Sequence, residues 1–221
     1  MKRLNNYFTL SLIILIGILT TGVSFADEGR QYEVTITNVT RGQIITPPVL
    51  ISHNGNFNLF TPGSTVIPEF EPLAEDGDAT SLLAYLGTVD DVFEYAQAGG
   101  PIMPGASVTV EISTKGNFRY LSAAGMLAST NDAFFGLNKV KAPRHGIKSV
   151  TSPAYDAGSE ANTESCDHIP GPPCGNHART TNGAEGYVHV HAGIHGMGDL
   201  TPAMHDWRNP VAKITIRPVH Q

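Results

Sequence analysis

The chain has 221 residues, a length that suits one large β domain or two small ones, and we expect one. Its formal net charge is −6, and no run of basic residues is present that could track phosphates. We therefore do not expect nucleic acid as a partner. With this modest negative charge, the chain does not repel divalent cations.

The first 26 residues have the pattern of a secretory signal peptide. Basic residues precede the apolar run LSLIILIGIL, which leads to the small-residue pattern SFA ending at Ala26. This run is shorter than the roughly 20 residues that a membrane-spanning helix needs, and no later stretch is apolar enough to cross a bilayer. We expect cleavage after Ala26 and an exported domain over 27–221, in the periplasm or outside the cell.

Alternating apolar and polar residues predict strands along most of the mature chain. The alternation is clean in QYEVTITNVT, where Tyr32, Val34 and Ile36 share one face. Further strands, separated by Gly, Pro and Asn as in a sandwich, are predicted at 107–114, 118–129, 133–140, 145–152, 186–193 and 211–218. The expected fold is mainly β, an antiparallel β-sandwich.

The segment 68–88 breaks this pattern, because its apolar residues follow helical spacing. Pro68 stands where a first helical turn begins, and Gly77 can end that helix. Asp78 can cap a second helix, which ends at Gly87. We expect two short helices inserted in the sandwich and packed on a sheet.

The two cysteines, Cys166 and Cys174, bracket the short segment DHIPGPP. They lack the C-x-x-C spacing of redox couples, and two nearby cysteines in an exported chain are more often a disulfide than a metal pair. We expect a disulfide bond that pins a loop. The surrounding stretch, 157–186, is rich in Gly, Pro, Asn and His, and loops of this length are usually functional or disordered.

The loop YDAGSEANTE, residues 155–164, is too short and too polar to be core. Asp156 and Glu160 can meet at one point if the loop turns, and Gly158 between them permits the turn. Asp132, at the start of a predicted strand, can supply a third carboxylate. Such a set suits calcium, which takes six to eight oxygen ligands. The alternatives are acid/base chemistry, or solvated loop acids in Asx turns and helical caps.

The motifs around these acids resemble the spondin domain family, a module of animal matrix proteins with bacterial homologues. The resemblance spans residues 31–218 and rests on the strand start NDAFFG and the loop motif DAGSE. It implies a C2-like antiparallel β-sandwich with one calcium ion, held by Asp132, Asp156 and Glu160. The chain has Glu at position 160 where the animal modules have Asp, and it lacks their cysteines.

A second group of candidate ligands lies in YVHVHAGIH. His189 and His191 are two residues apart on a predicted strand, so both project from the same face, and His195 follows. Imidazoles placed in this way are common ligands for zinc or copper. The alternative is that one histidine is buried and hydrogen-bonded while the others line a polar loop.

Together these features predict an exported calcium-binding module of the spondin kind. We expect it to act in adhesion or ligand binding, with a protein, a polysaccharide or a cell-surface component as its partner. The sequence contains no G-x-S-x-G, H-E-x-x-H or reactive-cysteine signature of an enzyme. The alternative function is a secreted copper- or zinc-dependent metalloenzyme that uses His189, His191 and His195.

Overall fold

The computed structural model describes residues 29–219, so the predicted signal peptide lies outside the described residues. Two antiparallel sheets form the molecule. The first has the strand order β4 (Ser107–Thr114), β1 (Arg30–Asn38), β10 (Ala212–Pro218) and β7 (Lys148–Ser152). The second has the order β3 (Val92–Gln97), β2 (Val49–His53), β5 (Tyr120–Met126), β6 (Ala133–Lys141), β8 (Ala154–Asp156) and β9 (His189–Val190).

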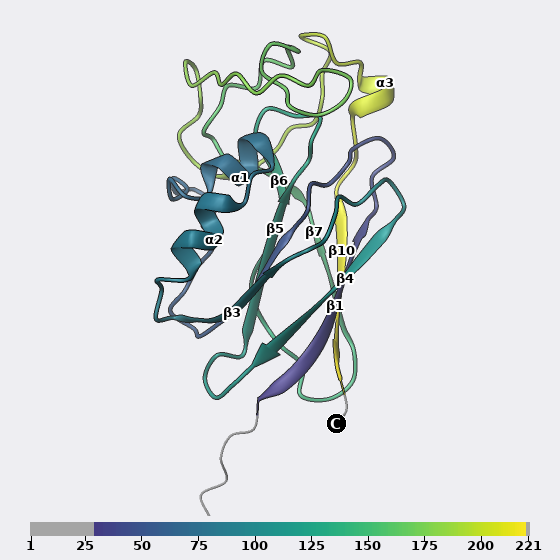
Figure 1. The fold of residues 1–221 in the computed structure, drawn as a ribbon. Coiled ribbons are helices and arrows are strands. Elements are labelled where there is room, and N and C mark those ends of the chain that lie inside the picture. The colour runs from purple at the N-terminus through teal and green to yellow at the C-terminus, as the bar shows by residue number, and fades with distance from the viewer. Residues whose placement is uncertain (1–28, 220–221) are drawn as a thin grey trace, which may run out of the picture.

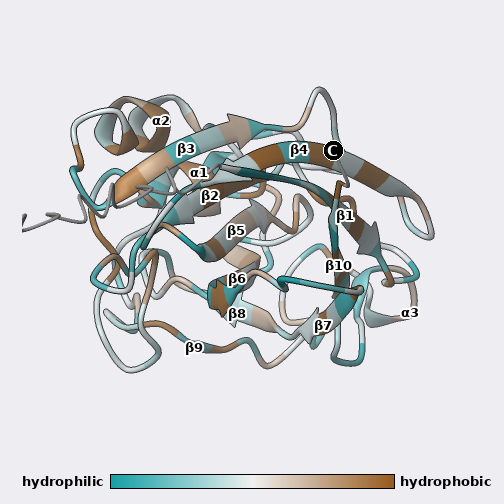
Figure 2. Ribbon diagram, turned by 90° about the horizontal axis from the view of Figure 1, so that it is seen from below, coloured by the Kyte–Doolittle hydropathy of each residue, from teal (hydrophilic) through white to brown (hydrophobic). Residues whose placement is uncertain are grey.

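The two sheets face each other across a shared hydrophobic core, and Figure 2 separates them as two layers of strands. In β1, Tyr32, Val34 and Ile36 are buried, as their alternation predicts. Leu50 of β2 and Phe135 of β6 meet them from the other sheet. Burial of this apolar surface is the main stabilising term, and the expected antiparallel β-sandwich is confirmed.

A second core lies on the outer face of the six-stranded sheet, beneath the helices α1 (Glu71–Asp76) and α2 (Thr80–Leu86) (Figure 1). Val49 and Ile51 of β2 pack there with Phe70 and Leu82. The two inserted helices are therefore confirmed. Every residue of β2 is buried, because one face of the strand meets the other sheet and the opposite face meets the helices.

The helix ends follow the sequence signals with two corrections, one of which is that Ala79, and not Asp78, is the N-cap of α2 and makes no side-chain capping bond. Gly77 ends α1 in a left-handed conformation with φ 71°, and the carboxylate of Asp78 accepts a hydrogen bond from the Thr80 N–H at 2.9 Å. The expected helix start at Pro68 is wrong, because α1 begins at Glu71 with Pro72 in its first turn. Residues 68–70 instead form a turn that leads into the helix.

Long loops gather at one end of the sandwich, together with the short helix α3 (Pro202–His205) (Figure 1). Between β8 and β9 the chain contains no helix or strand over 157–188. The strand expected over 186–193 is reduced to His189–Val190, which pairs with β8. Three chain segments therefore meet at this end: the start of β6, the end of β8 and the start of β9.

The predicted disulfide bond between Cys166 and Cys174 is present within this long loop. Disulfides of this kind persist in oxidising compartments, which fits an exported chain. Over residues 29–219, none of the helices combines the length and apolar character needed to cross a bilayer.

Removal of the disulfide is expected to lower the free energy of unfolding by about 2–3 kcal/mol, because the cross-link closes only a short loop of the unfolded chain. The double variant Cys166→Ser/Cys174→Ser tests this by urea unfolding, with the far-ultraviolet circular dichroism of the native state as a control for folding. An unchanged urea midpoint would contradict the expectation.

Candidate metal centre

Asp132 and Asp156 lie side by side at the loop end of the sandwich. Asp132 directly precedes β6, and its neighbour Ala133 is the pairing partner of Asp156 on β8. Both aspartates have 0% of their surface exposed. The alternative that they are solvated loop acids is therefore wrong.

The carboxylate of Asp132 holds the backbone of the DAGSE loop but leaves one oxygen without a partner. Its Oδ2 accepts hydrogen bonds from the N–H groups of Ser159 at 2.9 Å and Glu160 at 3.0 Å. Its Oδ1 is buried and has no hydrogen-bond partner. Burial first, and then the negative charge of Asp156, raise the pKa of Asp132 well above its usual range.

Asp156 accepts hydrogen bonds on both carboxylate oxygens. Oδ1 accepts from the Gly158 N–H at 2.7 Å, and Oδ2 accepts from the Asn162 side-chain amide at 2.6 Å. Gly158 has φ 69°, and a Cβ atom there would lie 2.4 Å from the carbonyl oxygen of Tyr187. The turn that Gly158 was expected to permit is confirmed. Burial raises the pKa of Asp156, and the bond from Asn162 opposes that rise.

The side chain of Glu160 is buried, and its carboxylate binds the loop backbone at Thr180. Its Oε1 accepts a hydrogen bond from the Thr180 N–H at 2.8 Å. Burial, followed by the negative charges of Glu75 and Asp76 on α1, raises the pKa of Glu160 to about 7. The expected joint ligation by Asp132, Asp156 and Glu160 stays a prediction.

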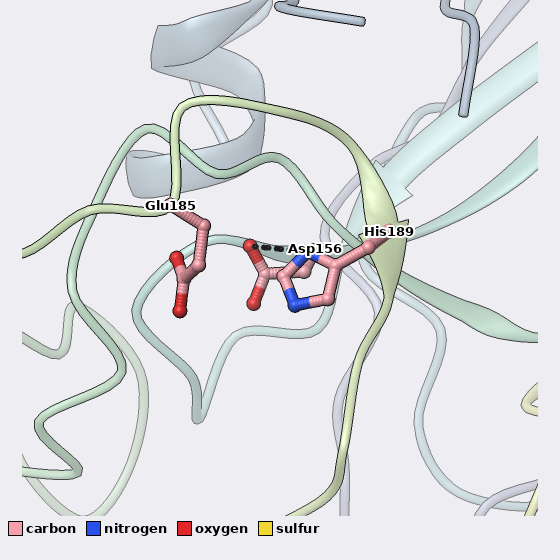
Figure 3. Close-up of side chains that lie close together, drawn as sticks. All are labelled: Asp156, Glu185 and His189. Atoms are coloured by element: carbon pink, nitrogen blue, oxygen red, sulfur yellow. Dashed lines mark ion pairs between the residues drawn. The ribbon is translucent and has the colours of Figure 1, made fainter. Parts of the chain in front are cut away.

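A group that can hold a metal ion is formed by Asp156, Glu185 and His189 (Figure 3). Their ligand atoms all lie within 4.8 Å of one another. Within residues 29–219, no other three His, Cys, Asp or Glu side chains form such a group. His189 is the pairing partner of Asp156 across β8 and β9, and its Nδ1 lies 3.7 Å from Asp156 Oδ1. Glu185 reaches the same place from the loop before β9. Sequence reasoning missed Glu185, a single acid in a stretch of Gly and Asn that carries no motif.

His191 is a buried, hydrogen-bonded histidine. Its Nδ1 accepts from the Gly193 N–H at 2.9 Å, so the proton is assigned to Nε2, which donates to Asn162 Oδ1 at 2.9 Å. Burial first, and then the charges of His189 and His195, lower the pKa of His191 to about 4. His195 is exposed. Of the three histidines predicted as ligands, His189 alone belongs to the group described above for residues 29–219.

Asn162 connects His191 to the acids. Its side-chain amide nitrogen donates to Asp156 Oδ2 at 2.6 Å and to Glu185 Oε1 at 3.2 Å, while its oxygen accepts from His191. The neutral imidazole therefore fixes which end of the Asn162 amide faces the carboxylates. This arrangement needs the backbone of Gly193 as well, since its N–H sets the tautomer of His191.

Glu164 secures the last loop of the site. Its buried carboxylate accepts hydrogen bonds from three successive backbone N–H groups, those of His195 at 2.6 Å, Gly196 at 2.7 Å and Met197 at 2.8 Å. The sequence offers no sign of this role. The exposed segment 195–197 is held in place by an acid that takes no part in the metal group.

Comparison of the chain with models of known protein families gives no match, and comparison with curated proteins gives none either. The resemblance to spondin domains therefore rests on the motifs at 131–136 and 156–160.

Glu160→Gln is expected to stabilise the metal-free protein at pH 8 and to leave its stability unchanged near pH 4. The carboxyl pKa is raised from 4.5 to about 7 on folding, so the wild-type protein loses stability as pH rises between these values, and a neutral amide does not. The Gln oxygen can still accept from Thr180. The change in pKa corresponds to about 3 kcal/mol, and screening by solvent reduces the expected gain above pH 7 to about 2 kcal/mol.

Unfolding by urea in the presence of a chelator, from pH 4 to pH 8, measures this difference. Glu111→Gln, on the exposed side of β4, is the control and should give no pH-dependent gain. A Glu160→Gln difference that is the same at every pH would contradict the burial of this charge.

Proposed function

We propose that this chain is an exported, calcium-binding β-sandwich module that binds a partner outside the cytoplasm. The observation that carries the proposal is the pair of fully buried carboxylates, Asp132 and Asp156, with Asp132 Oδ1 unpartnered. A calcium ion between them would be the missing binding partner of that oxygen. The resemblance of NDAFFG and DAGSE to spondin domains supports calcium as the ion.

The electrostatics of the pair support a bound cation. Two carboxylates that are buried together repel each other, and each loses its hydration. Within the described range, neither carboxylate has a Lys or Arg nitrogen within 4.0 Å, and their only charged-pair contacts are the longer ones of Asp156 to His189 and His191. A proton can neutralise one acid of the pair, and a dication can neutralise both.

Glu160 would complete the calcium site by turning its side chain toward the pair. Its backbone N–H is already bonded to Asp132, so the loop is in place around the pair. Loss of the Glu160 bond to Thr180 would free the carboxylate to turn toward the ion. Calcium needs six to eight oxygen atoms, and loop carbonyls and water would supply the remainder.

A cation at this position would order the loop end of the sandwich. The loop 157–188 wraps the site and contains the disulfide, so it is the segment whose conformation an ion would fix. We propose that this ordered end contacts a protein, a polysaccharide or a cell-surface component, in the periplasm or outside the cell. The proposal follows the adhesive role of the spondin modules that the motifs resemble.

The alternative of a zinc or copper enzyme built on His189, His191 and His195 has less support. Both ring nitrogens of His191 are occupied by hydrogen bonds, which leaves this residue no free ligand atom. A nitrogen ligand at His189 is compatible with the group formed by Asp156, Glu185 and His189.

Calcium is expected to raise the melting temperature of the wild-type protein, because it binds the folded state alone. At one hundred times its Kd, the ion adds about 2.7 kcal/mol to the free energy of unfolding. Asp132→Asn should abolish the increase, whereas His189→Gln should preserve it. Differential scanning calorimetry with calcium or a chelator measures the shift.

Magnesium is the control ion, since its smaller octahedral shell fits a site of flexible loop oxygens poorly. Asp132→Asn should remain folded and no less stable than the wild type in chelator, because a neutral amide replaces a carboxyl group whose charged form burial disfavours. An equal calcium shift in wild type and Asp132→Asn would overturn the proposed site.

A further inference from the structure

We propose that Asp156, Glu185 and His189 form a second metal position, which takes a transition-metal dication of the zinc class and not calcium. The position shares Asp156 with the proposed calcium site. It does not rest on calcium binding, since neither Asp132 nor Glu160 belongs to it. It also differs from a three-histidine site, because its other ligands are carboxylates.

Strand pairing places two of the three ligands. Asp156 and His189 are opposite residues on β8 and β9, and His189 Nδ1 lies 3.7 Å from Asp156 Oδ1. Glu185 lies four residues before His189, on the loop that leads into β9. Figure 3 shows its carboxyl group beside that of Asp156, with the imidazole of His189 on the other side. The ligand atoms lie within 4.8 Å of one another, and the exposed side chain of Glu185 can turn toward the other two.

The donor set decides the class of metal. Calcium and magnesium take oxygen ligands, whereas an imidazole nitrogen suits zinc, copper, iron and nickel. One imidazole and two carboxylates match the ligands that zinc accepts in proteins. The two carboxylates also balance the charge of a dication when the imidazole is neutral. The site would then be electrically neutral at a half-buried position.

Neighbouring groups already donate hydrogen bonds to both acids, as is usual for carboxylates that ligate a metal. Asn162 donates to Asp156 at 2.6 Å and to Glu185 at 3.2 Å, and His191 fixes the orientation of that amide. The Gly158 N–H holds the other oxygen of Asp156 at 2.7 Å. His191 is thus a positioning residue for this site and not one of its ligands.

A cavity adjoins two of the three ligands, Glu185 and His189. It has a volume of about 180 Å³ and is lined by Glu185 and His189, together with Asn131, Asn162 and His195. A zinc ion with three protein ligands would have its fourth position free, and the cavity has room for water or a small ligand there. Three protein ligands with one exchangeable position characterise zinc sites that bind a substrate or an external ligand.

Zinc titration by isothermal calorimetry tests the site, with zinc alone as the probe and the full mature chain as the protein. The wild type should bind one equivalent. His189→Gln and Glu185→Gln should each weaken binding by about tenfold or more, as expected for loss of a metal contact. His145→Gln, an exposed histidine in the turn between β6 and β7, is the matched control and should leave zinc affinity unchanged.

Two further variants separate this site from the other assignments. Asp132→Asn should lose the calcium-dependent rise in melting temperature yet retain zinc binding. His195→Gln should bind zinc with wild-type affinity, because His195 is not a ligand. Zinc affinity that is unchanged in His189→Gln, or lost equally in His195→Gln, would overturn the proposed ligand set. Failure of the calcium shift with zinc binding intact would remove the calcium proposal alone.

Discussion

The burial of two carboxylates next to each other is the constraint on which the loop end of this sandwich depends. Asp132 and Asp156 are brought together by the pairing of β6 with β8, and among the described residues no Lys or Arg nitrogen lies within 4.0 Å of either carboxylate. Their hydrogen bonds organise the loop that follows, since Asp132 binds the N–H groups of Ser159 and Glu160. A cation bound to these acids would therefore also stabilise the conformation of the loop that they hold.

Much of the fold could be predicted because most strands have one buried and one exposed face. In β1, β4 and β10 the alternation of residues such as Val34, Val110 and Ile214 gives the strand and its inward face together. β2 could not be found in this way, because the helices cover its outer face and all five of its residues are buried. The short strands β8 and β9 are fixed by pairing at the edge of the sheet, which local sequence does not encode.

The candidate site was predictable only where its residues carried a motif. Asp132 and Asp156 lie in NDAFFG and DAGSE, and the structure brings them side by side. Glu185 has no motif and joins the group only through the course of its loop. His189 and His191 were expected to act together, but β9 ends at Val190, and the two rings approach different oxygens of Asp156. Beyond the end of β9, the Gly193 N–H donates to His191, which in turn donates to Asn162 and does not point a free nitrogen at the metal group.

The most direct test of the central claim is an infrared difference spectrum of the metal-free protein against the calcium-loaded protein at neutral pH. Burial and the negative charge of Asp156 raise the pKa of Asp132 well above its usual range, so calcium should shift the balance of this buried group from the carboxylic acid to the metal-bound carboxylate. The carbonyl band of protonated carboxyl groups should therefore decrease when calcium is added, with release of a proton, and this calcium-dependent decrease should be missing in Asp132→Asn, whereas Glu160, with a pKa of about 7, still contributes to the band. A metal-free spectrum without any protonated carboxyl band, or one that calcium leaves unchanged, would contradict the account.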